Sequence, residues 1–242
     1  MQHPSGTADP TGRGSTFDLG RWVAYVTLGE SIGFLAPVLG FAVSVLGLGL
    51  GHHYLVGVGG PPTIFSSMML YGFAPWPRYV TMVLAGAVEG TCLGIAQSAA
   101  LRRGRVAVSR VGWIVATATG AAVAWMIGML PSTLADLGVP LDWSGPGIAA
   151  VIAGGLLLLV TIPALQWIVL RGAVERAWRW IPLNMAAWLV GLVFTFLPSP
   201  FIDYSTPAAV LLVAYAAAGV AMAVTVATLT GLGLRRMLRA AR

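Results

Sequence analysis

The stretch Gly86–Arg102, GAVEGTCLGIAQSAALR, is an apolar segment with glycines four residues apart that ends in arginine. It recurs along the chain. A shift of 69 residues places Gly86 on Gly155, and a further shift of 64 places Gly155 on Gly219. Each copy has roughly the length of a membrane span and is followed by a basic cluster. The sequence therefore predicts an integral membrane protein that is built by repetition.

The composition excludes an ordinary soluble domain. Of the 242 residues, 57% are hydrophobic and only 9% are charged, whereas soluble domains carry about 25% charged residues. The mean hydropathy of +0.84 points the same way. The formal charge of +6 comes from arginines beside apolar segments, which is an orientation signal and argues against a nucleic-acid partner. All basic residues are arginine, so a Schiff-base lysine, and with it a retinal pigment, is excluded.

Residue types that hold metals are scarce. Cys92 is the only cysteine, so neither an intrachain disulfide nor a cysteine-based zinc site can form. We expect no metal and no cofactor. The adjacent His52 and His53 could bind a metal with an acid from another external loop, although a solvated loop position is the simpler interpretation.

The chain divides into a tail and one membrane domain. Residues 1–20 are rich in Gly, Pro, Ser and Thr and predict a flexible cytoplasmic tail. Residues 21–242 predict an all-α fold, a polytopic membrane helix bundle with six transmembrane helices. The first apolar segment is longer than a span requires, which predicts tilt or a break near Pro37. The expected spans are 22–50, 78–101, 111–130, 147–170, 179–197 and 207–233.

The charges beside the spans predict the orientation. Arginines fill the loops after the second and fourth spans and the segment after the sixth, whereas the alternate loops hold Asp136, Asp142 and Asp203 and no arginine. Positive charges favour the cytoplasmic side of a membrane, so both termini are predicted to be cytoplasmic. Abundant Ala, Gly and Val without lysine fit a high-GC bacterial genome, so the expected location is a bacterial inner membrane.

The first external loop contains Gly-Gly-Pro-Pro at residues 59–62, which interrupts any helix. An apolar run follows these prolines. Because proline suits the first turn of a helix, we expect a short helix over 61–75 that lies at, or dips into, the outer surface.

The second half of each repeat also matches. A shift of 67 places Trp113 on Trp180, and Leu-Pro-Ser at 130–132 on Leu-Pro-Ser at 197–199. This predicts two hairpins inserted in the same direction, followed by the first half of a third copy. Trp22 in the first span keeps the spacing of Trp113, which suggests a pseudo-threefold arrangement. The predicted repeats cover about 78–140, 147–207 and 211–242.

Hairpins with Gly…Gln…Leu-Arg in one half and Trp…Pro-Ser in the other resemble those of uncharacterised multi-pass membrane proteins of actinobacteria and related bacteria. The resemblance covers residues 78–242. No activity is known for such proteins, so the resemblance assigns no functional residue.

Two acids lie inside apolar segments. Glu30 follows Arg21 by nine residues and Glu89 follows Arg78 by eleven, which places both roughly 13–17 Å from their arginines and near the midplane. An acid there costs at least about 2.5–3.5 kcal/mol if it faces lipid, so both are expected to face protein or water. They are either a candidate ion or proton site, in which two close carboxyls share a proton, or neutral packing elements between helices.

Other residues in the spans have structural interpretations. Gln97 and Gln166 occupy equivalent repeat positions, and with Asn184 they predict interhelical hydrogen bonds or the polar lining of a vestibule. Glycines at helical spacing let another helix approach closely, and the expected packing glycines are Gly86, Gly90, Gly94, Gly155 and Gly219. Tryptophans near the span ends are expected in the two aromatic belts of the membrane, namely Trp76, Trp113, Trp143, Trp167, Trp178 and Trp180.

Three functional classes compete. A proton- or cation-linked transporter or channel-like protein would use Glu30 and Glu89 at its centre, since repeats commonly place a site at their interface. A non-catalytic scaffold or accessory subunit would rely on the small-residue stripes, with other membrane subunits or copies of itself as partners in the lipid bilayer. An enzyme is the weakest interpretation. Residues 29–33 match the hydrolase pattern G-x-S-x-G, but they lie inside an apolar helix and not at the strand-to-helix turn that this chemistry needs.

Overall fold

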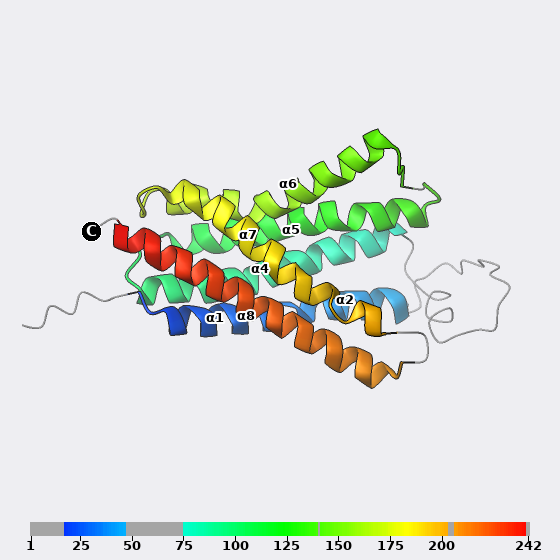
Figure 1. Ribbon diagram of the computed structural model, residues 1–242, viewed down its shortest axis with the longest axis horizontal. Coiled ribbons are helices and arrows are strands. Elements are labelled where there is room, and N and C mark those ends of the chain that lie inside the picture. The colour runs from blue at the N-terminus through cyan, green and yellow to red at the C-terminus, as the bar shows by residue number, and fades with distance from the viewer. Residues whose placement is uncertain (1–16, 47–74, 140, 203–205, 241–242) are drawn as a thin grey trace, which may run out of the picture.

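The structure is a computed structural model that describes residues 17–46, 75–139, 141–202 and 206–240 of the chain. Within these ranges the regular structure is helical, and there is no β-strand. The helices run along one common axis (Figure 1). Their bounds are α1 Leu19–Gly33, α2 Leu35–Leu46, α4 Pro75–Arg103, α5 Arg110–Asp136, α6 Gly145–Leu170, η1 Ala177–Arg179, α7 Trp180–Phe196, η2 Ser199–Phe201 and α8 Ala208–Ala240.

In the part of the chain that the structure describes, six helical segments are long and apolar enough to cross a membrane. This confirms the predicted all-α membrane bundle, and the protein is an integral membrane protein. Some of the observed helices extend beyond the predicted spans. For example, α5 continues through Pro131 to Asp136, where residue 130 was the expected end. A single proline removes one backbone hydrogen bond, which neighbouring groups can offset in a membrane helix.

The first span breaks after Gly33, which confirms the break expected near Pro37. Pro37 has no N–H, and its ring crowds the carbonyl group four residues earlier, which belongs to Gly33. At its other end α1 begins at Leu19, two residues before the predicted domain boundary. The helix starts there because Asp18 caps it, accepting a hydrogen bond from the backbone N–H of Arg21 at 3.1 Å.

Several expectations concern residues outside the described ranges. The surface helix expected over 61–75 lies there except for Pro75, which is the first residue of α4. His52, His53 and most of the predicted tail also lie outside the described residues.

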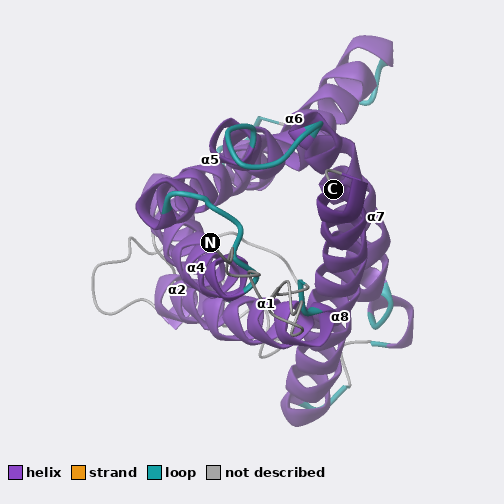
Figure 2. Cartoon of the chain, turned by 90° about the vertical axis from the view of Figure 1, so that its left-hand side faces the viewer, coloured by secondary structure: helices purple, strands orange, loops and turns teal. Residues whose placement is uncertain are grey.

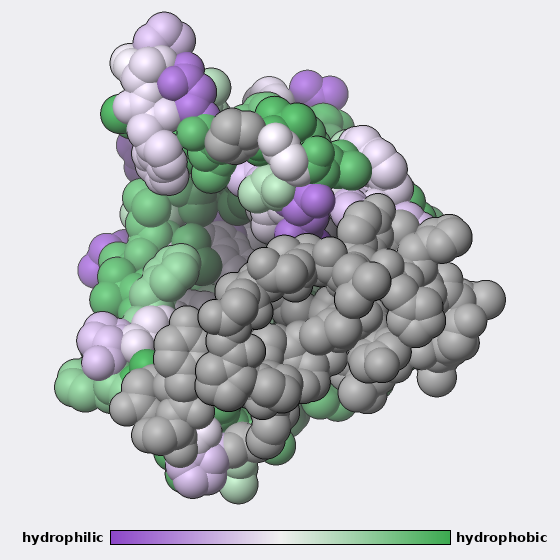
Figure 3. Space-filling view, turned by 90° about the vertical axis from the view of Figure 1, so that its right-hand side faces the viewer, coloured by the Kyte–Doolittle hydropathy of each residue, from purple (hydrophilic) through white to green (hydrophobic). Residues whose placement is uncertain are grey.

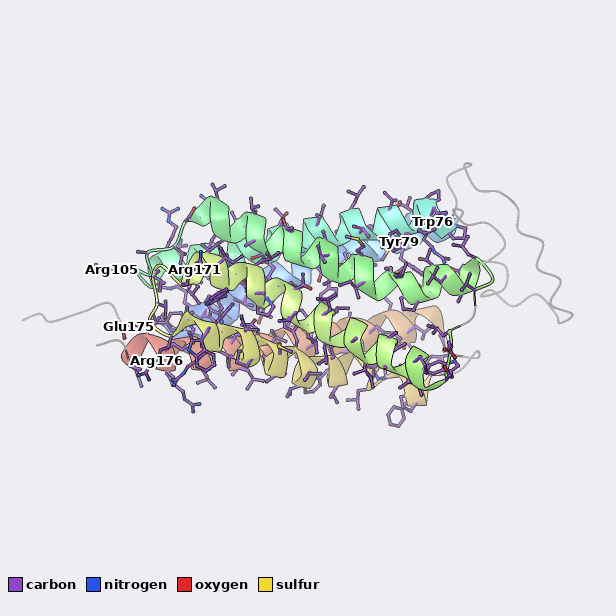
Figure 4. All side chains as sticks on the ribbon, turned by 90° about the horizontal axis from the view of Figure 1, so that it is seen from above. Trp76, Tyr79, Arg105, Arg171, Glu175 and Arg176 are labelled. Carbon is purple, nitrogen blue, oxygen red and sulfur yellow. The ribbon has the colours of Figure 1, made fainter. Side chains whose placement is uncertain are left out.

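Arginines collect at one end of the bundle. Figure 4 places Arg105, Arg171 and Arg176 at this end and Trp76 at the opposite one. We call these the arginine-rich end and the far end. By the positive-inside rule, the arginine-rich end is predicted to be cytoplasmic. Viewed along the axis from the arginine-rich end, the helices enclose a triangle (Figure 2).

The two hairpins pack differently. The helices α4 and α5 lie side by side along their length, whereas the far-end half of α6 diverges from the bundle (Figures 1 and 2). Pro163 lies inside α6, where it cannot donate a backbone hydrogen bond to the preceding turn, so the helix is weakened at that turn. The main hydrophobic core lies toward the arginine-rich end and includes the buried rings of Trp22, Trp113 and Trp180.

Candidate functional site

A buried layer of amide and hydroxyl groups crosses the bundle at the main core. Gln166 on α6 connects three helices, because its Nε2 group donates to Gln97 Oε1 at 2.8 Å and to Thr117 Oγ1 at 2.9 Å. All three side chains are at most 5% exposed. The two glutamines thus form an interhelical hydrogen bond of the kind that was predicted. Thr117 joins them, although threonine is too common in membrane helices to mark a site by itself.

Three buried tryptophans donate their indole N–H groups to this layer. The bonds run from Trp113 to Gln97 Oε1 at 3.0 Å, from Trp180 to Gln166 Oε1 at 2.9 Å and from Trp22 to Thr230 Oγ1 at 3.3 Å. The expectation that Trp113 and Trp180 belong to the aromatic belts is wrong, because neither ring is exposed. The flanking arginines indicate how deep these rings lie in the membrane, but the polar acceptors inside the bundle decide the direction in which the rings point.

The acceptors of these hydrogen bonds lie at equivalent positions of the predicted repeat. The acceptors Gln97, Gln166 and Thr230 occupy the same position in the three repeat units. Gln97 and Gln166 each accept the N–H of a tryptophan on the second helix of the same hairpin, and Thr230 accepts the N–H of Trp22 on α1. The contacts agree with three similar units around a central axis. The internal repeat and its pseudo-threefold symmetry stay predictions.

A small cavity borders this layer between α1, α4, α6, α7 and α8. Its polar lining comes from Glu30, Gln97, Gln166 and Asn184, and most of the remaining lining is aliphatic. The volume of the cavity that is open to the centre of a water molecule is about 10 Å³. This is room for about one water molecule. The cavity brings together four of the five polar residues predicted from the sequence.

Glu30 is the unusual member of this group. Its side chain is only 3% exposed, and neither carboxyl oxygen has a hydrogen-bond partner in the described part of the chain. Within the same residues, the one other buried side-chain atom without a partner is Thr27 Oγ1, one turn earlier on α1. An unpaired buried polar group costs several kcal/mol in an apolar environment, so this turn of α1 is suited to hold a polar ligand.

Glu89 is also buried, at 7% exposure, but it has a partner. The indole N–H of Trp125 on α5 donates to Glu89 Oε2 at 2.8 Å. Glu89 packs against α1 one turn beyond Glu30, since a Cβ added at Gly33 would lie 3.2 Å from Glu89 Cγ. Two charged carboxylates at these positions would repel one another.

The shared ion or proton site expected for Glu30 and Glu89 stays a prediction. Glu30 lines the cavity and Glu89 does not, because Trp125 holds the Glu89 carboxyl between α4 and α5. The two acids are therefore neighbours on facing helices with unequal surroundings. Trp125 was not foreseen as a site residue, because its role depends on which face of α5 meets α4.

The predicted packing glycines fall into two groups. A Cβ at Gly90 would lie 2.8 Å from the carbonyl oxygen of Thr117, and one at Gly86 would overlap the ring of Trp125. Gly94 is similarly close to α5, so all three allow a close approach of the two helices. Gly155 and Gly219 differ from the prediction, since nothing in the described chain lies within 4 Å of an added Cβ. The divergence of the far-end half of α6 leaves Gly155 without a neighbour.

Two further patterns do not assemble a site. The pentapeptide 29–33 ends α1 as regular helix, which is not the sharp turn of a nucleophile elbow. Across the described ranges there is no group of three or more His, Cys, Asp and Glu residues placed to hold a metal ion.

No protein-family model, curated protein or solved structure matches the chain. The resemblance to actinobacterial multi-pass proteins therefore stays a prediction.

Proposed function

We propose that this integral membrane protein is a proton-linked transporter in which Glu30 binds the proton. The observation that supports it is the Glu30 carboxyl, which is buried in the membrane-spanning bundle, borders a polar cavity and has no hydrogen-bond partner among the described residues. Ionisable residues inside a membrane bundle are rare and commonly mark ion pathways or proton relays. A bridging water in the cavity would connect the carboxyl to the polar layer.

The cavity favours a proton over a metal cation. A hard cation such as Ca²⁺ takes six to eight oxygen ligands. Here the Oε1 atoms of Gln97 and Gln166 already accept tryptophan N–H groups, and the space holds about one water molecule. Glu30 and Asn184 supply the remaining side-chain oxygens of the lining, which is too few to replace a hydration shell.

Glu89 has a supporting role in this proposal. Its carboxyl oxygen accepts the indole N–H of Trp125, a hydrogen bond that is stronger when that oxygen carries a negative charge. A proton on Glu30 would remove the repulsion between the two carboxylates across the α1–α4 interface. Release of that proton would restore the repulsion and push these helices apart, which couples proton binding to helix movement.

Two measurements test the proposal on the full-length protein. Infrared difference spectroscopy across pH should show the band of a protonated carboxyl that is absent in Glu30→Gln. Reconstituted vesicles with a trapped pH dye should show proton uptake driven by a membrane potential, and Glu30→Gln should reduce it to the level of protein-free vesicles. Glu175→Gln is the matched control, because Glu175 is an exposed acid in a loop at the arginine-rich end.

The outcomes separate binding from transport. A spectrum without any pH-dependent carboxyl band from Glu30 would refute proton binding at this residue. Wild-type proton uptake by Glu30→Gln would refute its role in transport.

A non-catalytic subunit of a membrane complex is the second candidate. It is favoured by the open space at Gly155 and Gly219, where another helix could pack. In that case Glu30→Gln leaves vesicle proton uptake unchanged, and cross-linking from cysteines placed at Gly155 captures a specific membrane partner.

A further inference from the structure

The central cavity is separated from the arginine-rich end by two layers of large apolar side chains. The first layer consists of the tryptophan rings of Trp22, Trp113 and Trp180, none of which is exposed. The ring of Trp180 lies 6.2 Å from that of Trp22 and 5.9 Å from that of Trp113, measured between centroids. The second layer consists of Leu101, Leu170 and Leu234, which are equally buried and each directly precede an arginine.

Hydrogen bonds hold the tryptophan layer in place. Each ring is tied through its indole N–H to an acceptor in the polar layer next to the cavity. If Trp180 turned aside, the buried Gln166 Oε1 would be left without a partner in the described chain, which costs about 1–3 kcal/mol. If Trp22 or Trp113 turned aside, its buried indole N–H would lose its acceptor. The rings and the leucines belong to one buried hydrophobic cluster, and close packing of such a cluster hinders the passage of water and polar solutes.

The far-end side of the cavity is packed less completely by the described residues. The hydrophobic cluster on this side contains three buried residues, Ala187, Met222 and Val226. The far-end half of α6 projects from the bundle (Figure 3), and its exposed residues include Ile148, Ile152 and Leu156. Thus α6, which lines the cavity, is held to the bundle at the polar layer and diverges from it toward the far end (Figures 1 and 2).

We infer that the cavity beside Glu30 exchanges with the far-end side of the membrane, and that the tryptophan layer is the barrier toward the arginine-rich side. This inference concerns access and holds whether the ligand is a proton or another small polar species. Movement that admits the ligand would take place in the far-end halves of α6, α7 and α8, while the tryptophan layer stays closed.

A single reporter cysteine tests this inference. Ala223 lines the cavity and is 1% exposed, so Ala223→Cys adds one sulfur atom facing the cavity. The native thiol is removed by Cys92→Ala. Ag⁺ in chloride-free buffer is added to one side of sealed vesicles. The protection of the cysteine from later labelling gives the rate at which Ag⁺ reacts with it. The controls Ser144→Cys at the start of α6 and Ser109→Cys at the start of α5 identify the far-end and arginine-rich sides, since both positions are exposed.

We expect Ag⁺ to react with Ala223→Cys at least about tenfold faster from the side that labels Ser144→Cys, because a closed layer adds to the kinetic barrier. Adding Trp180→Ala should raise the rate from the other side. Leu170→Ala provides a second opening of the barrier if the tryptophan variant does not fold. Equal rates from both sides, a faster rate from the arginine-rich side, or no reaction from either side would overturn the inference, whatever the result for proton uptake.

Discussion

The hairpins α4–α5 and α6–α7 share a sequence pattern and a polar layer, but they differ in the halves toward the far end. In the first hairpin, Trp125 covers Gly86 and donates to Glu89. At the corresponding positions of the second hairpin, a shift of 69 gives Gly155 and Leu158, and the space over Gly155 is open.

The comparison shows what a glycine in a membrane helix does. A glycine lets another helix approach closely. The two helices are held together only if a large side chain on the facing helix fills the space over the glycine. In α4–α5, the tyrosine hydroxyl of Tyr79 also donates to the Met126 carbonyl at 3.0 Å, and an ion pair joins Arg78 to Asp136. The first hairpin is therefore fastened along its whole length, and the second mainly at the polar layer.

Matched substitutions of the repeated glycines should give the largest difference. Gly86→Leu displaces Trp125 and should destabilise the protein by about 3 kcal/mol, since overpacking of a tight contact typically costs 1–3 kcal/mol and the bond to Glu89 is also lost. Gly155→Leu fills open space and should stay within about 0.5 kcal/mol of wild type. Reversible unfolding in detergent measures both. Equal losses would show that the two hairpins are equally tight.

Removal of the shared polar layer should have the next largest effect. Gln166→Leu deletes three interhelical or buried hydrogen bonds and leaves Trp180 without an acceptor, so we expect a loss of about 2 kcal/mol. The control in the same helix is Thr161→Val, which removes a hydroxyl that donates to the Leu157 carbonyl of its own helix. A control as damaging as Gln166→Leu in the unfolding titration would contradict the role given to this layer.

A smaller effect is expected from removing the hydrogen bond between Trp125 and Glu89, which has no counterpart at Leu158 of the second hairpin. Trp125→Phe keeps an aromatic ring over Gly86 and removes the N–H that Glu89 accepts. The loss should be about 1 kcal/mol. If the bond helps to hold Glu89 charged, combining Trp125→Phe with Glu89→Gln should cost less than the sum of the two. Additive losses of stability in this double-mutant cycle would show that the side chains of Trp125 and Glu89 do not interact.

The smallest effect concerns the turn that starts the second hairpin. Ser144 donates its hydroxyl and its backbone N–H to Asp142 at 2.5 and 2.8 Å, and these bonds lower the pKa of Asp142 below its ordinary value of 3.8. The contribution to stability is complete above the ordinary pKa and is lost as the pH falls through the lower folded value. Asp142→Asn should therefore match wild type at acid pH and be slightly less stable near neutrality, in melting curves at several pH values.

Part of this picture could be predicted from the sequence alone. Hydropathy, span length and the separation of arginines from other charges predict six membrane helices and place Glu30, Gln97 and Gln166 at their depths. Those properties depend on the distance along a helix, which follows from the number of residues. The break in the first span was predictable for a similar reason, because Pro37 acts on its own helix.

Only the tertiary structure decided which of these residues meet. Depth along a helix does not state the direction in which a side chain points, and direction depends on how neighbouring helices rotate and tilt. For this reason Trp113 and Trp180 face the interior and not the membrane belts, Glu89 meets Trp125 while Glu30 lines the cavity, and Gly155 remains uncovered although Gly86 is filled.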